Sequence, residues 1–317
     1  MQTIMQGLSR AKGIKPNSTI GIITTGSPTE PNRFDAGINE LHRRGFRVHY
    51  PLDPRSNYGS SQTLVSATAR ERADALMSVV ANPEISIIIA ARGGYGCNEL
   101  LPFIDFSRIR AGHKLIVGYS DVTPLLVATF AKAGIPSIHG PTIAREFADA
   151  AANPEALESI EILLRTVTEP SFTPSYSCEI LRKGNATGTI LAGNLTMLCT
   201  LLGTPWDVSY DGCVLVLEDV NEAAYRIHRA LTQLRLAGKL NKLAAVVFGR
   251  FSEERASPGP SVSEVIRQSV DDIFAGTRFP VLSGLPFGHN GKNISLPVGC
   301  RAEVREGTFR ILESPIG

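Results

Sequence analysis

The sequence lacks the cysteine pattern of a disulfide-linked or zinc-binding protein. Its five cysteines, at positions 97, 178, 199, 213 and 300, form no C-x-x-C pair and are odd in number. A disulfide framework needs paired cysteines, and a structural zinc site needs closely spaced ones. We therefore expect reduced thiols. Because the sequence has no cluster of metal ligands, we also expect no bound metal and no cofactor.

A charge excess of one sign and a long apolar run are also missing. The 32 Lys and Arg residues nearly balance 30 Asp and Glu residues, which leaves a net charge of +2. Such a chain has no field that attracts nucleic acid or an anionic membrane, so we expect small-molecule partners. No window approaches the roughly 18 apolar residues that cross a bilayer, and the N-terminus has no secretory cleavage pattern. We expect a cytoplasmic protein.

What the sequence does contain is a repeated alternation of short apolar runs and longer helical patterns. With 317 residues, of which 43% are hydrophobic, the chain is long enough for two domains. Continuous apolar strands are typical of a parallel sheet covered by helices on both faces, so we predict an α/β domain over residues 1–165. The expected strands lie at 19–25, 46–50, 85–91 and 115–120, and the expected helices at 32–44, 63–81, 122–133 and 153–165.

The second half, residues 166–317, is predicted to be a linker followed by a mixed α/β domain. Residues 166–177 are rich in Pro, Ser and Thr without periodicity, which is typical of a linker. The expected strands lie at 187–193, 213–219 and 244–251, with closing strands after 279, and the expected helices at 194–203, 221–237 and 261–275.

The segment KLIVGYSDVTPLL, residues 114–126, places Ser120 at a sharp strand-to-helix corner. A nucleophile elbow needs a small residue two positions before the serine, and Gly118 is that residue. Val122 stands where the usual G-x-S-x-G pattern has its second glycine. Ser120 or Asp121 also suits a simple helix cap, so both interpretations stay open on this segment alone.

A serine nucleophile needs a base, and the base needs an orienting acceptor. His139 and His289 both occupy glycine-flanked loops after apolar segments, and His289 is the better candidate because glycines lie on both sides of it. His42, His49, His113 and His228 occupy expected packing or surface positions. For a single loop histidine a purely structural role remains an alternative.

The carboxylate candidates end a buried strand, the site-bearing end of a parallel sheet. Asp219 or Asn221 is expected to cap the next helix, and Glu222 suits its first turn. Glu218 then remains as the acceptor for the histidine.

The loop ARGGYGC, residues 91–97, follows another expected strand. It lacks the third glycine of a dinucleotide fingerprint at the right offset. Gly93 and Gly94 let backbone N–H groups approach a substrate, and the amide of Asp121 is a second donor for an oxyanion hole. Turns that require positive φ are the alternative explanation for these glycines.

These segments together resemble the serine LD-carboxypeptidases, the murein tetrapeptide carboxypeptidase family that includes the microcin C immunity peptidases. GYSD, LEDV and FGHN carry Ser120, Glu218 and His289 in the family's order. The segments ARGGYGC, HGP, GNLTMLCTLLGTPWD, VVFGRF and NISLPVG also match, and the resemblance extends from about residue 18 to 313.

The resemblance implies an amidotransferase-like, flavodoxin-like N-terminal domain with Ser120 and a smaller swivelling-type C-terminal domain with Glu218 and His289. It implies a Ser-His-Glu triad assembled across the domain interface, a homodimer, no metal, and release of D-alanine from murein tetrapeptides. Cleavage of peptidyl or aminoacyl nucleotides and non-catalytic ligand binding are the alternatives. The group that binds the terminal carboxylate of the substrate stays open among Arg92, Arg145 and Lys292.

Overall fold

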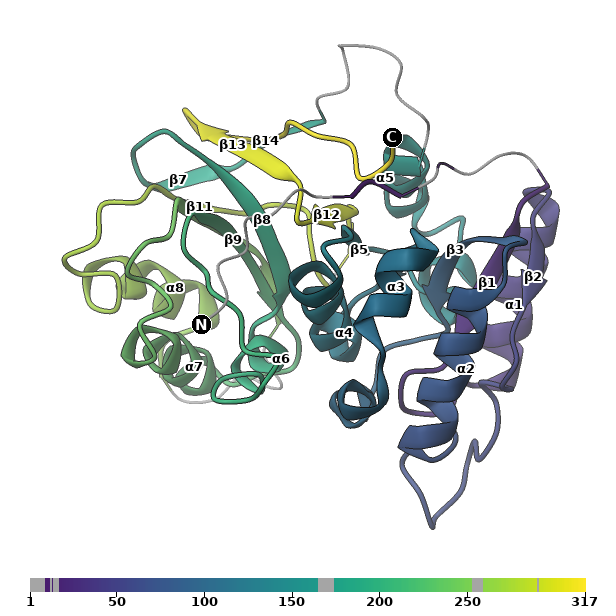
Figure 1. The fold of residues 1–317 in the computed structure, drawn as a ribbon. Coiled ribbons are helices and arrows are strands. Elements are labelled where there is room, and N and C mark those ends of the chain that lie inside the picture. The colour runs from purple at the N-terminus through teal and green to yellow at the C-terminus, as the bar shows by residue number, and fades with distance from the viewer. Residues whose placement is uncertain (1–8, 12, 14–16, 165–173, 253–258, 290) are drawn as a thin grey trace. The chain divides into compact units, whose positions relative to one another are not determined.

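The computed structural model describes residues 9–11, 13, 17–164, 174–252, 259–289 and 291–317. These residues form two compact units, each with its own sheet (Figure 1). The N-terminal unit contains the described residues up to 164 together with 294–298 and 315–317. The C-terminal unit contains the described residues 174–293 and 299–314.

The N-terminal unit contains a six-stranded sheet in the order β12-β5-β4-β3-β1-β2. Strands β1 to β5 are parallel, and β12 pairs antiparallel with β5. The order 2-1-3-4-5 is that of a flavodoxin-like doubly wound sheet, so the predicted fold class is confirmed. The strands are β1 (Thr19–Ile23), β2 (Arg47–His49), β3 (Ile85–Ala90), β4 (Leu115–Gly118), β5 (Ser137–His139) and β12 (Leu296–Val298).

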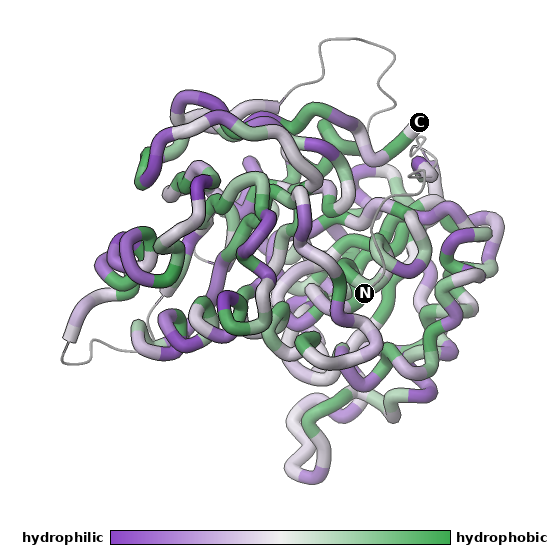
Figure 2. Tube along the Cα trace, turned by 60° about the vertical axis from the view of Figure 1, so that its left-hand side comes forward, coloured by the Kyte–Doolittle hydropathy of each residue, from purple (hydrophilic) through white to green (hydrophobic). Residues whose placement is uncertain are grey.

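Most helices of this unit bury one face against the sheet or a neighbouring element, whereas the short helix Thr123–Ala128 is buried at every residue. In α1 (Pro31–Arg43), for example, Phe34, Gly37 and Leu41 are buried at helical spacing. The hydropathy colours of Figure 2 show the resulting alternation of hydrophobic and hydrophilic residues along the helices. The other helices are α2 (Ala69–Ala81), α3 (Phe106–Gly112), α4 (Thr123–Ala128) and α5 (Pro154–Leu164), with shorter turns at η1 (Cys97–Phe103), η2 (Ser120–Val122), η3 (Thr129–Ala133) and η4 (Ile143–Phe147).

The start of α2 differs from the expected start at residue 63. The Thr68 hydroxyl accepts the N–H of Glu71, and the Glu71 carboxylate accepts the N–H of Thr68, a reciprocal capping box. This cap satisfies backbone donors that would otherwise lack partners, and it fixes the helix start at Ala69. Residues 63–67 therefore belong to the preceding loop.

The C-terminal unit contains an eight-stranded sheet in the order β6-β14-β13-β8-β9-β10-β11-β7. Its central strands, β8 to β11, are parallel, and antiparallel strands flank them on both sides. The helices α7 and α8 lie side by side in Figure 1. The elements are β6 (Ser175–Ser177), β7 (Glu179–Arg182), β8 (Ala186–Asn194), α6 (Leu195–Cys199), β9 (Cys213–Asp219), α7 (Ala224–Leu236), β10 (Ala245–Phe251), α8 (Val262–Asp271), β11 (Val281–Ser283), β13 (Arg301–Arg305) and β14 (Thr308–Ile311).

Three segments of the second half lie outside the positions expected for them, and one of these, residues 315–317, belongs to the N-terminal unit. Residues 175–177, expected in the linker, form the edge strand β6 against β14, while residues 165–173 lie outside the described residues. Residues 294–298, assigned to the second domain, belong to the N-terminal unit because β12 pairs with β5. Among the described residues, the helices all lack the length and apolar character needed to cross a bilayer.

Candidate functional site

Ser120 lies at the corner between β4 and the turn η2, in the N-terminal unit. Its backbone has φ = 63°, in the left-handed region, while Tyr119 before it is fully extended. A non-glycine residue in this region costs roughly 1–2 kcal/mol, and such strain collects at functional sites. Pro124 stands in the first turn of α4, which continues the corner into a helix. The predicted strand-turn-helix context of a nucleophile elbow is present.

The Gly93–Gly94 segment packs directly against this corner. A Cβ atom added to Gly93 would lie 2.8 Å from the Ser120 Cβ and 3.2 Å from its Oγ. Gly94 has φ = 118°, and an added Cβ would lie 2.6 Å from the Ser27 Cβ. Both positions require glycine, one for close approach and one for backbone conformation as well. The structure therefore brings Gly93 and Ser120 together, as the sequence analysis expected.

The side chain of Asp121 is buried and does not cap the helix that follows it. Its Oδ2 accepts the N–H of Cys97 at 2.9 Å, and the N–H of Gly96 also donates to this carboxylate. Burial raises the pKa of Asp121 to about 6, although the hydrogen bonds and Arg72 oppose that shift. The alternative of a simple helix cap is thus wrong for Asp121.

Glu218 and His289 form the second group of site residues, in the C-terminal unit. Glu218 is fully buried near the carboxyl end of β9, and His289 is buried in the loop after β11. The His289 Nδ1 lies 2.6 Å from the Glu218 Oε2, a short hydrogen bond. The carboxylate fixes the ring orientation and favours a proton on Nδ1, which leaves Nε2 as the nitrogen suited to act as a base.

The loop that carries His289 is fixed by Gly288 and Asn293. Gly288 has φ = 116°, and an added Cβ would lie 2.8 Å from the Glu218 Cβ. Its N–H donates to the Oδ1 of Asn293, which is itself buried. The sequence pattern alone predicts no such role for either residue. The glycine before the histidine was the available signal, and its importance depends on a contact with Glu218 that the sequence does not show.

Asp219 has a role different from the expected cap of the helix after β9. Its carboxylate accepts the N–H and hydroxyl of Thr196 and the side-chain amide of Asn194, which lie at the start of α6. The helix α7 begins later, after Ala223, without a side-chain cap. The expectation failed because parallel pairing of β8 with β9 places Asn194 beside Glu218, so α6 is the nearer helix start.

His139 is not in a cleft-facing loop. It ends β5, is fully buried, and its ring centroid lies 5.5 Å from that of Tyr119. The Tyr119 hydroxyl in turn lies 2.8 Å from the Glu146 Oε1. His139 therefore belongs to the interior of the N-terminal unit, and the preference for His289 is consistent with this placement.

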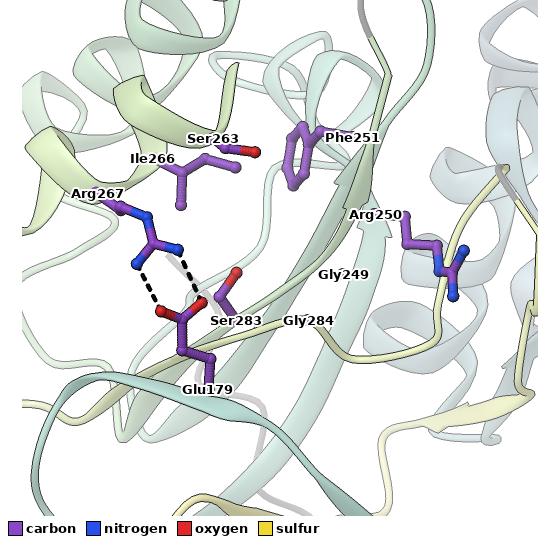
Figure 3. A pocket seen from close by; sticks show the side chains of 9 residues that line it. All are labelled: Glu179, Gly249, Arg250, Phe251, Ser263, Ile266, Arg267, Ser283 and Gly284. Carbon is purple, nitrogen blue, oxygen red and sulfur yellow. Dashed lines mark hydrogen bonds and ion pairs between the residues drawn. The ribbon is translucent and has the colours of Figure 1, made fainter. Parts of the chain in front are cut away.

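A pocket of about 320 Å³ lies at the carboxyl ends of β10 and β11. Figure 3 shows Arg267 and Glu179 joined on one wall, with Arg250 directed away from the other lining side chains. An added Cβ on Gly291 would lie 2.6 Å from the Arg250 Nη1, so Arg250 contacts the loop that carries His289. The pocket shares its sheet edge with Glu218, because β9, β10 and β11 are parallel.

The three cations considered for the substrate carboxylate lie in different settings. Arg92 is half-buried and donates to the carbonyl of Pro28 at 3.0 Å. The Arg145 side chain is 50% exposed and lies 3.7 Å from Glu146. Lys292 is exposed in the loop after His289.

Comparisons with known proteins place both halves of the chain in one family. Residues 20–140 match the LD-carboxypeptidase N-terminal domain, and residues 187–304 match the LD-carboxypeptidase C-terminal domain. The chain belongs to the LD-carboxypeptidase family. A murein tetrapeptide carboxypeptidase of Pseudomonas aeruginosa is 28% identical over 91% of this chain and 93% of its own length.

Comparisons with solved structures support the same family assignment. A muramoyltetrapeptide carboxypeptidase from Oxalobacter formigenes is 32% identical, with a TM-score of 0.81, 94% coverage of this chain and 100% of that one. The microcin C7 self-immunity protein in complex with aspartyl sulfamoyl adenosine is 25% identical, with a TM-score of 0.87 and coverages of 98% and 100%. The resemblance inferred from the motifs is therefore confirmed.

Proposed function

We propose that this LD-carboxypeptidase family member is a serine carboxypeptidase that releases the terminal D-alanine from murein tetrapeptides. Ser120 Oγ attacks the carbonyl of the L-centre that precedes D-alanine, and His289 Nε2 accepts its proton. Glu218 stabilises the imidazolium that forms. The backbone N–H groups of Gly93 or Gly94 and of Asp121 donate to the oxyanion, where one donor is typically worth about 3–4 kcal/mol.

The remaining steps use the same residues, with His289 acting first as an acid and then again as a base. His289 returns the proton to the amide nitrogen, the C–N bond breaks, and D-alanine leaves as the free amino acid. Water then attacks the acyl-enzyme, gives its proton to His289, and releases the tripeptide as a carboxylate while Ser120 recovers its hydroxyl. We place this reaction in the cytoplasm, as a recycling step for cell-wall peptides.

The observation that carries this proposal is the buried hydrogen bond between Glu218 and His289. A buried carboxylate on Nδ1 is the support that a catalytic histidine requires, and it has little purpose for a surface residue. The left-handed backbone at Ser120 supports the nucleophile assignment. The names of the Pseudomonas and Oxalobacter relatives support the choice of a murein tetrapeptide as substrate.

Mass spectrometry of a muramyl tetrapeptide incubated with the protein tests this function. We expect loss of one alanine, and Ser120→Ala or His289→Ala should lower kcat by about 10⁴ to 10⁶. Ser78→Ala, a change at an exposed position of α2, is the matched control and should leave kcat unchanged. Release of D-alanine by Ser120→Ala at the wild-type rate would refute the mechanism.

A second candidate function is cleavage of an aminoacyl or peptidyl nucleotide. The relation to the microcin C7 self-immunity protein of Escherichia coli, 28% identical over 90% of each chain, favours it. The same triad would serve both reactions, so only the substrate differs. Parallel assays with a murein tetrapeptide and an aminoacyl nucleotide, compared by kcat/KM, decide between them.

A further inference from the structure

A buried arginine, paired with a partly exposed carboxylate, contacts the Gly93–Cys97 segment in the N-terminal unit. Arg72, on α2, is fully buried, an unusual position for a guanidinium because loss of its hydration is costly. Its Nη2 lies 2.6 Å from the Glu99 Oε2, and its Nε donates to the carbonyl of Ala67 at 2.9 Å. Sequence analysis gave no role to this arginine.

The guanidinium of Arg72 connects the loops that follow two neighbouring strands. Its Nη1 donates to the carbonyl of Gly96, after β3, at 3.0 Å and also to the carbonyl of Thr25, after β1. The next residue, Gly26, packs so closely that an added Cβ would lie 2.0 Å from the Tyr95 carbonyl oxygen. Hydrogen bonds and close packing therefore join the two loops.

Asp121 holds the other polar side of the same segment. Arg72 binds the Gly96 carbonyl, and the Asp121 carboxylate accepts the N–H groups of Gly96 and Cys97. Gly96 has φ = 118°, in a region that favours glycine. The hydrogen bonds to the Arg72 cation on one side and to the Asp121 carboxylate on the other stabilise this backbone conformation. The charged and titratable groups that face Asp121 are Arg72, Glu99 and Cys97.

The segment held in this way is the one that touches Ser120. Gly93 contacts the Ser120 side chain, and Asp121 is the next residue in the chain after the serine. One carboxylate therefore links the backbone after the serine to the far end of the glycine segment. A displacement of about 1 Å in such a constellation can cost about 100-fold in rate.

We infer that Arg72 and the side chain of Asp121 are positioning residues that hold the Gly93–Cys97 segment against Ser120. The inference rests on the proposed function, since it concerns the donors that the oxyanion requires. Neither side chain needs to touch the substrate. Their effect should therefore appear in kcat rather than KM, and in the mobility of residues 93–97.

The test compares Arg72→Met, Arg72→Lys and Asp121→Asn with wild type in D-alanine release and in hydrogen exchange of the 93–97 amides. We expect kcat to fall about 10- to 100-fold with KM unchanged, and exchange of this segment to rise at least 10-fold. Lysine should not restore kcat, because it keeps the charge without the planar fork. Asp121→Asn is nearly isosteric and keeps the test valid if Arg72→Met fails to fold.

Arg182 supplies the matched control. It is a similar arginine in the C-terminal unit, which donates to the carbonyls of Phe279 and Phe274 and to the Thr277 hydroxyl. Arg182→Met should lower stability without changing kcat or exchange at 93–97. If Arg72→Met and Asp121→Asn behave like this control, the inference is wrong. Inactive wild type refutes the proposed function instead, while unchanged exchange in the variants still refutes the positioning role.

Discussion

The two corners that carry the candidate site residues are built by different means. Ser120 is placed by its own backbone, in a left-handed conformation at the end of β4. His289 is placed by a side-chain partner, the buried carboxylate of Glu218. A glycine packs against each corner, Gly93 against Ser120 and Gly288 against Glu218.

This difference matches the chemistry that each group would perform. A nucleophile needs a fixed oxygen position beside the oxyanion donors, which a rigid backbone turn supplies. A base must gain and lose a proton, so it needs a partner whose charge compensates the imidazolium. The comparison predicts that changes to the supporting side chains should affect the histidine corner most, whereas changes of backbone packing should affect both corners.

Among changes to the residues that support the serine and the histidine, replacing the carboxylate at the histidine corner should have the largest effect. Glu218→Gln keeps the shape but removes the negative charge, and its amide can favour the wrong tautomer of His289. We expect kcat for D-alanine release to fall by about 10⁴, as for other triads that lose their acid. Glu303→Gln, which breaks the partly exposed pair with Arg310 between β13 and β14, is the control and should leave kcat unchanged. A fall below 10-fold for Glu218→Gln would contradict the proposed role.

Gly288→Ala tests the packing behind that carboxylate. The new Cβ would lie 2.8 Å from the Glu218 Cβ and 2.9 Å from its Oε2, at a backbone φ of 116°. Crowding and left-handed strain together should destabilise the protein by about 2–4 kcal/mol and lower kcat about 100-fold. Urea unfolding and steady-state kinetics measure the two effects.

Gly276→Ala separates strain from crowding in the same unit. Gly276 has φ = 79°, and an added Cβ would meet no atom within 4 Å. Only the conformational cost should appear, about 1 kcal/mol, without any change in kcat. Equal kinetic effects of the two alanines would show that contact with Glu218 is unimportant.

Gly93→Ala applies the same test to the serine corner, with a smaller expected effect. The φ of Gly93 is not positive, so the change introduces crowding of Ser120 without left-handed strain. We expect kcat to fall about 10- to 100-fold and a destabilisation of about 1–3 kcal/mol. Gly112→Ala, which would crowd Val80 at 3.0 Å, should show a loss of stability alone. A wild-type kcat for Gly93→Ala would show that packing of this loop against Ser120 is unimportant for catalysis.

The local sequence pattern was sufficient to predict the parallel sheet and the corner at Ser120. Both depend on a continuous apolar strand and on the residues that directly follow it in the sequence. It was insufficient for Asp219 and β12, whose partners lie in other segments. Asp219 binds Thr196, 23 residues away, and β12 pairs with β5 more than 150 residues earlier in the chain. The role of Arg72 could not be predicted for the same reason, since the local sequence around an arginine in a helix does not indicate its complete burial.

The smallest expected effect concerns the pH dependence of stability at the serine corner. Burial raises the pKa of Asp121 from 3.8 to about 6, so the folded protein binds more protons than the unfolded chain between these values. Stability relative to Asp121→Asn should therefore be highest below pH 4 and fall by about 2 kcal/mol as the pH rises through 6.

Urea unfolding at pH 4, 5, 6 and 7 measures this difference, and Asp105→Asn is its control. Asp105 caps α3, where hydrogen bonds from Ser107 and Arg108 hold its pKa below the ordinary value. Its difference from wild type should stay flat from pH 5 to 7, since Asp105 is ionised there in both the folded and the unfolded chain. A flat difference for Asp121→Asn as well would mean that the hydrogen bonds from Gly96 and Cys97 and the charge of Arg72 fully offset the cost of burying the carboxylate.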